Sequence, residues 1–551
     1  MNLATPTSGL LEASGEAIQA TEFPYLRSPD QDAGTPVRHP VVVVGAGPVG
    51  LSLAVDLAQR GQKVLLLDND HRLSHGSRAL CFAKRTLEIW DRLGVGQPMV
   101  DKGVSWNLGR VFLQDRQVYE FDLLPEAGHE RPAFINLQQY YCEAYLVDRL
   151  LRLPNAEIRW DNKVSGIDNR DDGALLTIDT PEGPYQVMAD WVAACDGSRS
   201  TVRSLLGLES KGRVFQDRFL IADVKMKADF PAERWFWFDP PFHPNQSVLL
   251  HREPDDVWRI DFQLGWDADP EEEKKPQRII PRVKALLGHD VDFTLEWASV
   301  YTFACLRMDR FVHGRVIFAG DSAHGVSPFG ARGANSGVQD AENLAWKLDW
   351  VLKGRADESL IATYGVEREY AADENILNST RATDFITPKS EVSRLFRDAA
   401  LGLARDFDFA RRIVNSGRLS VPAVIGKSPL NTPDVDAFKG AQVPGAVLTD
   451  APVTLANGQT SWLLRELGVD FTLLVFAEAP AWTRDLPFVR TLVVGKDVLD
   501  PEGLLASRLD AVPGTAYLIR PDQHVCARWR EPTRARVMAA MDTATAAPST
   551  H

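Results

Sequence analysis

The chain has 551 residues, of which 44% are hydrophobic and 25% are charged. These values are typical of globular proteins, and at about 150 residues per domain the length predicts three or four domains, or fewer large ones. The formal net charge of −14 disfavours binding to nucleic acid or to an anionic membrane, and no local basic patch offsets it. We therefore expect an acidic globular protein with neither kind of partner.

The five cysteines are at least 53 residues apart in the sequence. No CxxC pair or other metal-ligand spacing occurs, so we predict no metal site and reduced thiols. Residues 1–40 lack the apolar segment of a secretory signal, and no apolar run reaches the ~18 residues of a membrane span. These features predict a cytoplasmic protein.

In chain order, residues 1–40 have little periodicity and contain the breakers Pro24, Pro29, Pro36 and Pro40, so we predict a flexible N-terminal arm. A run of four valines from Val41 predicts a buried strand of the parallel type. The motif GAGPVG follows, and then apolar residues at helical spacing up to Gly61. The segment KVLLLD predicts a second buried strand that ends at Asp68, which completes one βαβ unit.

The middle of the chain has a different pattern. Short alternating segments predict antiparallel strands between about 100 and 190, around one helix, and again in an inserted sheet at about 211–300. RVIFAGD at 315–321 predicts another buried strand, followed by helices to about 417. We predict an FAD- or NAD-binding unit at 41–420, a linker at 421–445 and a compact α/β module at 446–545.

The GAGPVG motif has the features of a dinucleotide-binding turn. Gly45 permits a tight turn, Gly47 lets the backbone approach a pyrophosphate, and Gly50 lets helix and strand pack closely. The helix N-terminus would supply amide donors to the phosphates. Asp68, 18 residues after Gly50, is placed to accept from ribose hydroxyls. A chance glycine-rich turn is the alternative, and at this point both NAD and FAD stay open.

Two further motifs complete the pattern. CDGSRSTVR begins at Cys195 after an apolar strand, and Gly320-Asp321 leads through Pro328 into GARGANSG. With these motifs, residues of about 40–545 resemble the single-component FAD-dependent aromatic hydroxylases, the superfamily of p-hydroxybenzoate hydroxylase. The phenol hydroxylase and 3-(3-hydroxyphenyl)propionate hydroxylase subgroup is the most similar part of that family.

The resemblance implies a set of cofactor-binding residues. Asp196 and Gly197 would serve both FAD and the nicotinamide, Asp321 would hold the ribityl chain, and Pro328 would lie against the flavin ring. Because GANSG opens a long helix, its amides and dipole would also direct positive potential at the reduced flavin. The implied set is Gly45, Gly47, Pro48, Gly50, Asp68, Arg78, Gln138, Asp196, Gly197, Gly320, Asp321, Pro328, Gly333, Ala334 and Asn335.

The resemblance also implies a fold and a reaction. The fold is α/β (α+β overall), with a Rossmann-type FAD-binding domain interleaved with an antiparallel-sheet substrate domain, and a C-terminal thioredoxin-like domain without CxxC. In the reaction, NADH or NADPH reduces noncovalent FAD, and O2 forms a flavin C4a-hydroperoxide that hydroxylates a phenolic, acidic aromatic substrate. The C-terminal domain of such proteins makes packing and oligomer contacts, which implies a homodimer.

Two positions depart from the family pattern. Leu80 stands where these enzymes carry an aspartate or histidine base, so His75, His251, Tyr301 and His324 become the titratable candidates, with His251 the predicted catalytic one. A surface or buried structural role is the alternative for each of them. Arg332 replaces the usual glutamine of the glycine turn, either as an outward-facing cation or as a partner for an acidic substrate. Pro328, Arg332 and His251 are thus the predicted catalytic residues.

The segment Trp235–Pro240 leaves a second enzyme class open. Its WxWxDP pattern is similar to the WxWxIP segment of flavin-dependent halogenases, although Lys63 and Lys84 have ordinary strand and helix contexts for the lysine that those enzymes need. An aromatic strand that lines an apolar cavity is the favoured interpretation. A halogenase or epoxidase on the same fold, and a non-catalytic flavoprotein, stay as alternatives.

Overall fold

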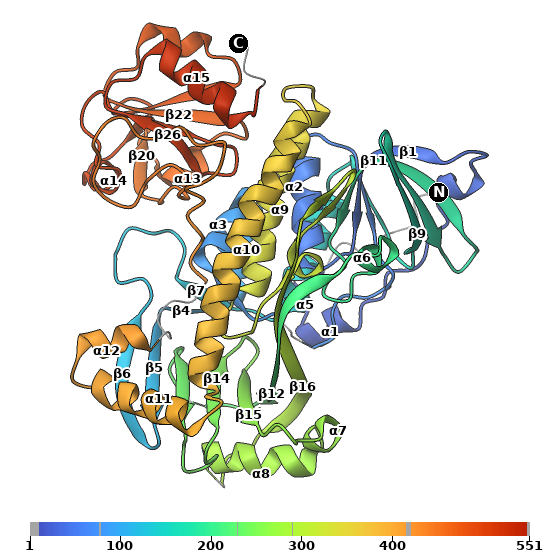
Figure 1. Ribbon diagram of the computed structural model, residues 1–551, viewed down its shortest axis with the longest axis vertical. Helices are drawn as coiled ribbons and strands as arrows, with labels where there is room; N and C mark the ends of the chain where they lie inside the picture. The colour runs from blue at the N-terminus through green and yellow to red at the C-terminus, as the bar shows by residue number, and fades with distance from the viewer. Residues whose placement is uncertain are drawn as a thin grey trace.

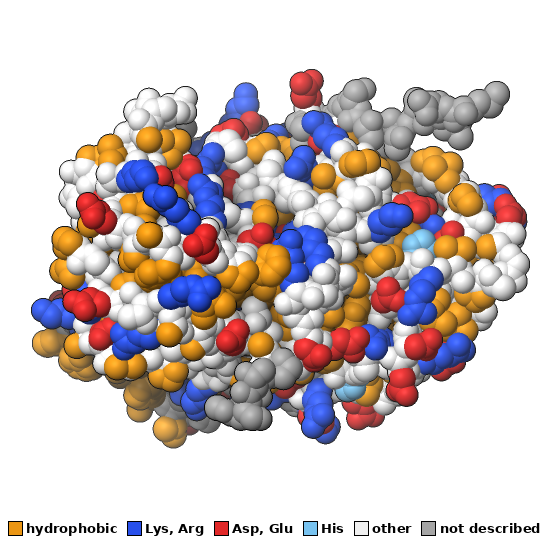
Figure 2. All heavy atoms as spheres, turned by 90° about the horizontal axis from the view of Figure 1, so that it is seen from above, with side chains coloured by type: hydrophobic (Ala, Val, Ile, Leu, Met, Phe, Trp, Pro, Cys, Tyr) orange, Lys and Arg blue, Asp and Glu red, His pale blue; other side chains and the backbone are white. Residues whose placement is uncertain are grey.

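Four sheets organise the computed structural model, counted over the residues it describes, which are 10, 12–76, 79–228, 230–288, 290–414 and 420–547. Figure 1 shows a C-terminal domain at the upper left, a first sheet at the upper right and a second sheet at the bottom, with two long helices between them. On the face shown in Figure 2, basic and acidic side chains lie intermixed with apolar ones. No helix of the described residues is both long and apolar enough to span a membrane.

The first sheet has a parallel core in the order β18-β11-β1-β2-β8. Its four-valine strand β1 is buried on both faces, as the sequence predicts for a parallel strand. The strands of this sheet are β1 (Val37–Val44), β2 (Val64–Leu67), β8 (Ala156–Arg159), β9 (Lys163–Arg170), β10 (Gly173–Asp179), β11 (Tyr185–Ala194), β17 (Val312–His313) and β18 (Val316–Phe318).

Helices α2 and α5 pack on each other, and α2 also packs on the long helix α9, which in turn packs on α10. In Figure 1, α9 and α10 extend from the C-terminal domain toward the second sheet. The helices of this part are α2 (Pro48–Gln59), α3 (Lys84–Arg92), α4 (Gly96–Lys102), α5 (Gln139–Leu151), α6 (Thr201–Leu205), η2 (Gly320–Ser322), α9 (Gly333–Leu352) and α10 (Ser359–Ile386). Three short strands form a small sheet in the order β3-β7-β4. Strand β3 (Cys81–Ala83) comes before α3 and α4 in the chain, and β4 (Val104–Trp106) and β7 (Phe134–Asn136) come after them.

The second sheet is larger than the predicted insertion at about 211–300. It also takes two strands from 108–122, because β13 pairs in parallel with β5 and thereby joins the β5–β6 hairpin to the insertion. Its order is β19-β16-β12-β15-β14-β13-β5-β6. The strands are β5 (Leu108–Leu113), β6 (Arg116–Asp122), β12 (Ser210–Lys225), β13 (Arg234–Phe238), β14 (Ser247–Arg252), β15 (Val257–Leu264), β16 (Thr294–Met308) and β19 (His324–Gly325).

Short helices surround this sheet. In Figure 1, α7 and α8 lie below it, and α11 and α12 lie beside β5 and β6. Their bounds are α7 (Pro270–Glu273), α8 (Pro276–Leu287), α11 (Glu391–Ala404) and α12 (Asp408–Ile413). Ile279 and Val283 of α8 join the apolar cluster on one face of the sheet. On the other face, side chains of α10, α11 and α12 and Phe329 join a second apolar cluster.

The prediction of a flexible arm before residue 41 is wrong for the part of the arm that the structure describes. Ile18, in α1 (Gly15–Gln19), and Phe23 are buried in the core of the first sheet. The ring of Phe23 stacks on Trp160 with centroids 4.5 Å apart. A short 3-10 helix, η1 (Pro29–Asp32), then leads into β1, which begins at Val37. Leu10, Ile18 and Phe23, the buried apolar side chains of this segment, follow no helical or strand period, and this is why the sequence pattern did not indicate them.

Residues 421–445, predicted as a linker, contain no helix or strand. The domain that follows holds a mixed seven-stranded sheet, in the order β21-β20-β24-β23-β22-β25-β26. Its elements are β20 (Pro452–Leu455), β21 (Thr460–Trp462), α13 (Leu463–Glu466), β22 (Phe471–Phe476), η3 (Ala481–Asp485), β23 (Val489–Val494), β24 (Val498–Leu499), α14 (Leu504–Arg508), β25 (Ala516–Ile519), β26 (Val525–Trp529) and α15 (Arg534–Ala544).

A fully buried ionic network joins this C-terminal domain to α9 and α10. Arg520 binds Glu367 of α10 through both terminal nitrogens, at 2.5 and 3.0 Å, and its Nε donates to Asp522 at 2.9 Å. Lys347 of α9 donates to Glu367 at 2.7 Å, and Asn343 donates to Glu367 and to Asp522. Burial alone would raise the pKa of Glu367, but Arg520 and Lys347 lower it. These buried ion pairs and hydrogen bonds therefore hold the C-terminal domain against α10 and against α9, the helix that begins at Gly333.

We predict that Glu367→Gln destabilises the protein by about 3–5 kcal/mol, because it leaves buried cations without a compensating charge. Unfolding by urea, followed by fluorescence and circular dichroism, measures the change. Glu358→Gln is the matched control, since Glu358 caps the same helix and makes an exposed ion pair with Arg315. That variant is expected to lose no more than about 1 kcal/mol. Equal losses in the two variants would contradict the assigned role of the network.

Candidate functional site

The predicted motifs meet at one edge of the first sheet. The last residue of β1, Val44, pairs with Leu67 of β2 and with Ala194 of β11, and Ala194 pairs with Phe318 of β18. Because these strands are parallel and in register, the segments that follow them leave the sheet on the same side. Gly45, Asp68, Asp196 and Gly320-Asp321 follow these strands within three residues.

The three glycines of GAGPVG have different surroundings. Gly45 has a φ of +105°, and a Cβ there would collide with the carbonyl of Cys195. A Cβ on Gly50 would collide with the carbonyl oxygen of Gly45. Gly47, in contrast, has no heavy atom within 4 Å of a Cβ position, and it caps α2 without a side-chain hydrogen bond. Gly45 and Gly50 are required by the fold, whereas Gly47 leaves open space at the helix N-terminus, which suits a phosphate group.

Asp68 braces this turn. Its carboxylate accepts from the backbone N–H of Ala46 at 2.5 Å and from that of Asp70 at 2.8 Å. Burial raises the pKa of Asp68, against these two hydrogen bonds. The carboxylate thus connects β2 to the GAGPVG turn, at the side where a ribose would lie.

The next two acidic residues, Asp196 and Asp321, lie at the same edge. Asp196 accepts from the Val202 N–H at 3.0 Å through one oxygen, and its other oxygen is buried without a partner among the described residues. Gly197 has a φ of +76° and open space beside it. Asp321 is exposed, and its Oδ1 lies 3.9 Å from the position of a Cβ on Gly333. The acid therefore faces the start of α9.

His324 supports this turn from behind. Its Nε2 lies 2.6 Å from Asp340, which also accepts from Arg368 at 2.6 Å and from the Gly320 N–H at 3.0 Å. Burial opposes ionisation of Asp340, but His324 and Arg368 together lower its pKa. With both residues fully buried, His324 has a structural role, and His75 lies exposed.

The glycine turn before α9 is fixed by one side chain. The Asn335 carboxamide accepts from the Ala83 N–H at 2.8 Å and from the Thr86 hydroxyl at 2.6 Å. It donates to the carbonyls of Cys81, at 2.9 Å, and Ala331, at 2.6 Å. Any contact of this turn with a ligand is therefore left to the backbone of 333–334 and to Pro328. Pro328 is exposed, and Gly333 and Ala334 are half-buried.

Of two other predicted cofactor contacts, Gln138 and Arg78, the structure describes only Gln138. Gln138 is buried, and its Nε2 donates to the Pro254 carbonyl at 3.3 Å. Its Oε1 has no partner among the described residues. Arg78 lies outside the described residues. Gln138 thus keeps an acceptor available at the boundary between the two sheets.

Arg332 lies against α10. It is buried, caps α9, and donates through Nη1 to Asn375 at 3.1 Å. The guanidinium is folded over Gly330, since a Cβ there would lie 2.9 Å from Nε. Arg332, the predicted partner of an acidic substrate, is therefore hydrogen-bonded to α10.

Alternate residues of the second sheet form an apolar wall on the side of the glycine turn. Phe219 and Phe303 lie on neighbouring strands, and both contact Phe329 of the turn edge-on, with centroids 4.9 and 5.5 Å apart. Phe236 and Phe238 belong to the same cluster. Their neighbours on β13, Trp235 and Trp237, pack instead with the opposite cluster that α8 covers. The halogenase-like segment is thus an ordinary strand with two aromatic faces.

A group of ionisable residues extends this wall, and only His251 among them was predicted from the sequence. Arg259 binds both oxygens of Asp223 at 2.8 Å and lies 3.3 Å from Glu253. Burial raises the pKa of Glu253 to about 8 and that of Asp261 to about 6, and it lowers the pKa of His251 well below its usual value. The alternation of Arg259 and Asp261 in an otherwise apolar strand was the available signal.

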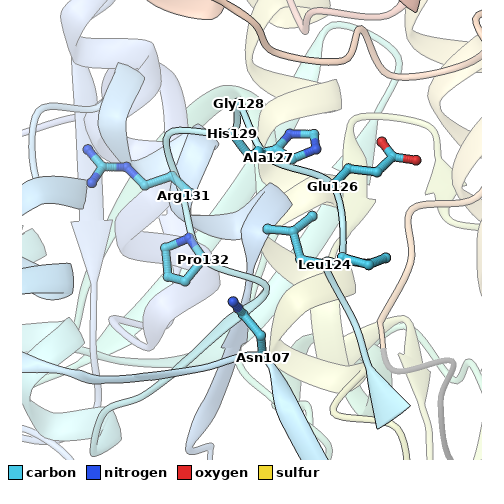
Figure 3. Close-up of a pocket in the computed structure, with 9 residues that line it drawn as sticks. Asn107, Leu124, Glu126, Ala127, Gly128, His129, Arg131 and Pro132 are labelled. Atoms are coloured by element: carbon cyan, nitrogen blue, oxygen red, sulfur yellow. The ribbon is translucent and has the colours of Figure 1, made fainter.

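A pocket of about 320 Å³ lies elsewhere, in the loop between β6 and β7 (Figure 3). Arg131 in its wall is bound to Asp91 and Gln97. Burial lowers the pKa of His129 to about 4. The loop meets the C-terminal domain, where Arg508 donates to the Gly128 carbonyl at 2.6 Å. None of the predicted site residues lines this pocket.

Comparisons with known proteins agree with this geometry. A family described as "FAD binding domain" matches residues 38–379. The chain is 31% identical to a probable NADH-specific resorcinol 4-hydroxylase of Rhodococcus jostii, over 88% of this chain and 91% of the relative. It is also 31% identical to 6-methylpretetramide 4-monooxygenase of Streptomyces rimosus, over 89% and 90%. The crystal structure of the flavin-dependent monooxygenase PieE, with FAD and substrate, has the same fold, with a TM-score of 0.80, 22% identity, and coverage of 93% of this chain and 100% of that one.

The contrast between two glycines yields a prediction. Gly47→Ala adds a methyl group to open space at a φ of −77° that alanine accepts, so the FAD-free protein should keep its melting temperature. Its FAD affinity should fall at least tenfold, about 1.4 kcal/mol, because the methyl group occupies the approach of the pyrophosphate. Gly50→Ala should lower the melting temperature itself. Calorimetry and FAD titration measure both, and unchanged FAD binding by Gly47→Ala would refute the assignment.

A second prediction concerns Asp321. If its exposed carboxylate accepts hydrogen bonds from the ribityl chain, each charge-assisted bond contributes about 1.5–3 kcal/mol. Asp321→Ala should therefore weaken FAD retention by about ten- to a hundredfold. Flavin absorbance after dialysis gives the occupancy. Asp309→Ala is a control in which an exposed aspartate paired with Lys211 is lost, and full occupancy in Asp321→Ala would contradict the assignment.

Proposed function

The chain belongs to the FAD-binding domain family, which matches more than half of it, and we propose that it is an NAD(P)H-dependent monooxygenase that hydroxylates a phenolic aromatic substrate. As an aromatic hydroxylase of this superfamily it uses FAD and a reduced nicotinamide. The observation that supports the substrate class is the aromatic wall of the second sheet, which faces the turn where the flavin ring would lie. NADH and NADPH both stay within the proposal, and so does a cytoplasmic location.

The residues at the strand ends fit FAD. The open space at Gly47 would admit the pyrophosphate, Asp68 would accept from the ribose, and Asp196 and Asp321 would accept from the ribityl chain and its surroundings. Gln138 would offer its unpaired carbonyl oxygen to the ring. Bound FAD supplies the redox chemistry, taking a hydride from the nicotinamide and activating O2 for transfer of one oxygen atom.

The protein's own contribution is to place the phenol and to exclude water. Phe219, Phe303 and Phe329 supply flat apolar surfaces against which an aromatic ring packs. We assign the phenolic proton to His251, whose buried Nδ1 has no partner among the described residues. Because burial lowers its pKa, the imidazole is neutral at pH 7 and can accept a hydrogen bond from the phenolic hydroxyl. Pro328 and the backbone beside it would define the ring's distance from the flavin.

The C-terminal domain supports the thioredoxin-like part of the proposal. Its strands β23-β22-β25-β26 place one parallel pair beside an antiparallel hairpin, and α15 follows. Cys526, the one cysteine of this domain in the described chain, is buried, and burial raises its thiol pKa to about 12. We propose a structural role for the domain, through its ionic network with α9 and α10, and a homodimer contact on its outer surface.

The direct test is substrate-stimulated NADH or NADPH oxidation by the purified, flavin-loaded protein. We expect at least one phenol of a panel to accelerate oxidation about tenfold or more over the substrate-free rate, and the product to gain one oxygen atom by mass spectrometry. The same panel with added chloride or bromide tests for halogenation. A halogenated product, or a flavin-loaded protein that no phenol stimulates, would contradict the proposal.

A further inference from the structure

Arg234 is a buried cation without an acceptor in the described part of the chain. It is 8% exposed, and it takes part in no hydrogen bond or ion pair with the residues that the structure describes. Other buried arginines of this protein are bound, as Arg85 is to Glu342, Arg259 to Asp223 and Arg520 to Glu367. An isolated buried charge destabilises a folded protein. A bound anion would supply the counter-ion that the folded chain does not give to Arg234.

The position of Arg234 places it at the predicted substrate site. On β13 it shares a face with Phe236, because side chains alternate along a strand. The groups that act on it are Asp261 and Tyr301 of the second sheet and Cys81 of β3, in the FAD-binding part. The Cys81 carbonyl in turn accepts from Asn335 of the glycine turn. The guanidinium therefore lies between the two sheets, beside the aromatic wall.

The neighbouring charges leave Arg234 available. Arg259, the second cation of the group, is bound to Asp223 on both oxygens and lies beside Glu253. Asp261 influences Arg234 without forming an ion pair with it. Desolvation lowers the pKa of Arg234, because burial disfavours a charged guanidinium that has no counter-ion beside it.

We infer that Arg234 is an anion subsite that binds a carboxylate on the aromatic substrate. The inference rests on the proposed function, which it refines from phenols to phenols that carry an acid group. A guanidinium presents a planar pair of donors that matches a carboxylate. The FAD phosphates have their own place beside Gly47 at the N-terminus of α2, so the substrate is the anion that this position serves. Arg332, which the sequence offered for the same role, is directed at Asn375.

The test compares each acid with its own neutral amide. The probes are 3-(3-hydroxyphenyl)propionate, 2,4-dihydroxybenzoate and their primary amides, titrated into the flavin-loaded protein by calorimetry. For at least one acid, we expect Arg234→Met to raise Kd by about ten- to a hundredfold and to change Kd of its amide by less than about threefold. Arg234→Lys should recover part of the loss. Arg252→Met, which removes an arginine from the other face of neighbouring β14, should bind as the parent does.

A second readout needs no substrate. Because Arg234→Met removes an unpaired buried charge, the ligand-free variant should melt no lower than the parent, whereas a structural arginine would leave a lower melting temperature. A lower melting temperature would therefore overturn the inference. So would acid binding that survives Arg234→Met, acid binding that Arg332→Gln abolishes instead, or the absence of acid-selective binding throughout the series.

The two proposals fail separately. Acidic phenols that bind to the parent and to Arg234→Met with equal Kd, and stimulate NADH oxidation equally in both, would uphold the hydroxylase and overturn the subsite. Acid binding that depends on Arg234, in a protein that no phenol stimulates to oxidise NADH or NADPH, would uphold the subsite and overturn the hydroxylase.

Discussion

The carboxamide of Asn335 holds together the parts on which the site depends. Its four hydrogen bonds join the start of α9 to β3 and α3, so that the glycine turn has one position relative to the small sheet. A buried amide that uses its donors and acceptors fully is strongly oriented, because any displacement leaves a polar group unpaired. The turn can therefore present backbone groups to a flavin without a side chain that moves. The aromatic wall and Arg234 both take their place relative to this turn.

Buried charge is distributed unequally over the molecule. Between the C-terminal domain and the long helices, Glu367, Arg520 and Lys347 satisfy one another. Facing the site, Arg234 and one oxygen of Asp196 are left without protein partners among the described residues. Such unsatisfied groups reduce stability and persist where a ligand completes them. The satisfied network thus supports α9 from one end, while the unsatisfied groups mark the ligand-binding end.

Local patterns were informative where one short segment carries the whole signal. The four valines of β1 and the turn at Gly45 could be assigned because a buried parallel strand and a glycine turn each depend on a few consecutive residues. The N-terminal arm could not, since Ile18 and Phe23 are buried by contacts with distant parts of the chain. The two faces of the Trp235–Phe238 strand were likewise undetermined, because a strand's period does not say which sheet lies on which side.

The sequence by itself determined the dinucleotide-binding unit, the family and the acids that follow its strands, because those features are written in contiguous motifs. Only the tertiary structure decided how single polar residues are used. It bound Arg332 to α10 and His324 to Asp340, and it left Arg234 without a partner among the described residues. A residue type states what bonds are available, but whether they are already used depends on neighbours that are distant in sequence. That is a property of packing, and no local pattern contains it.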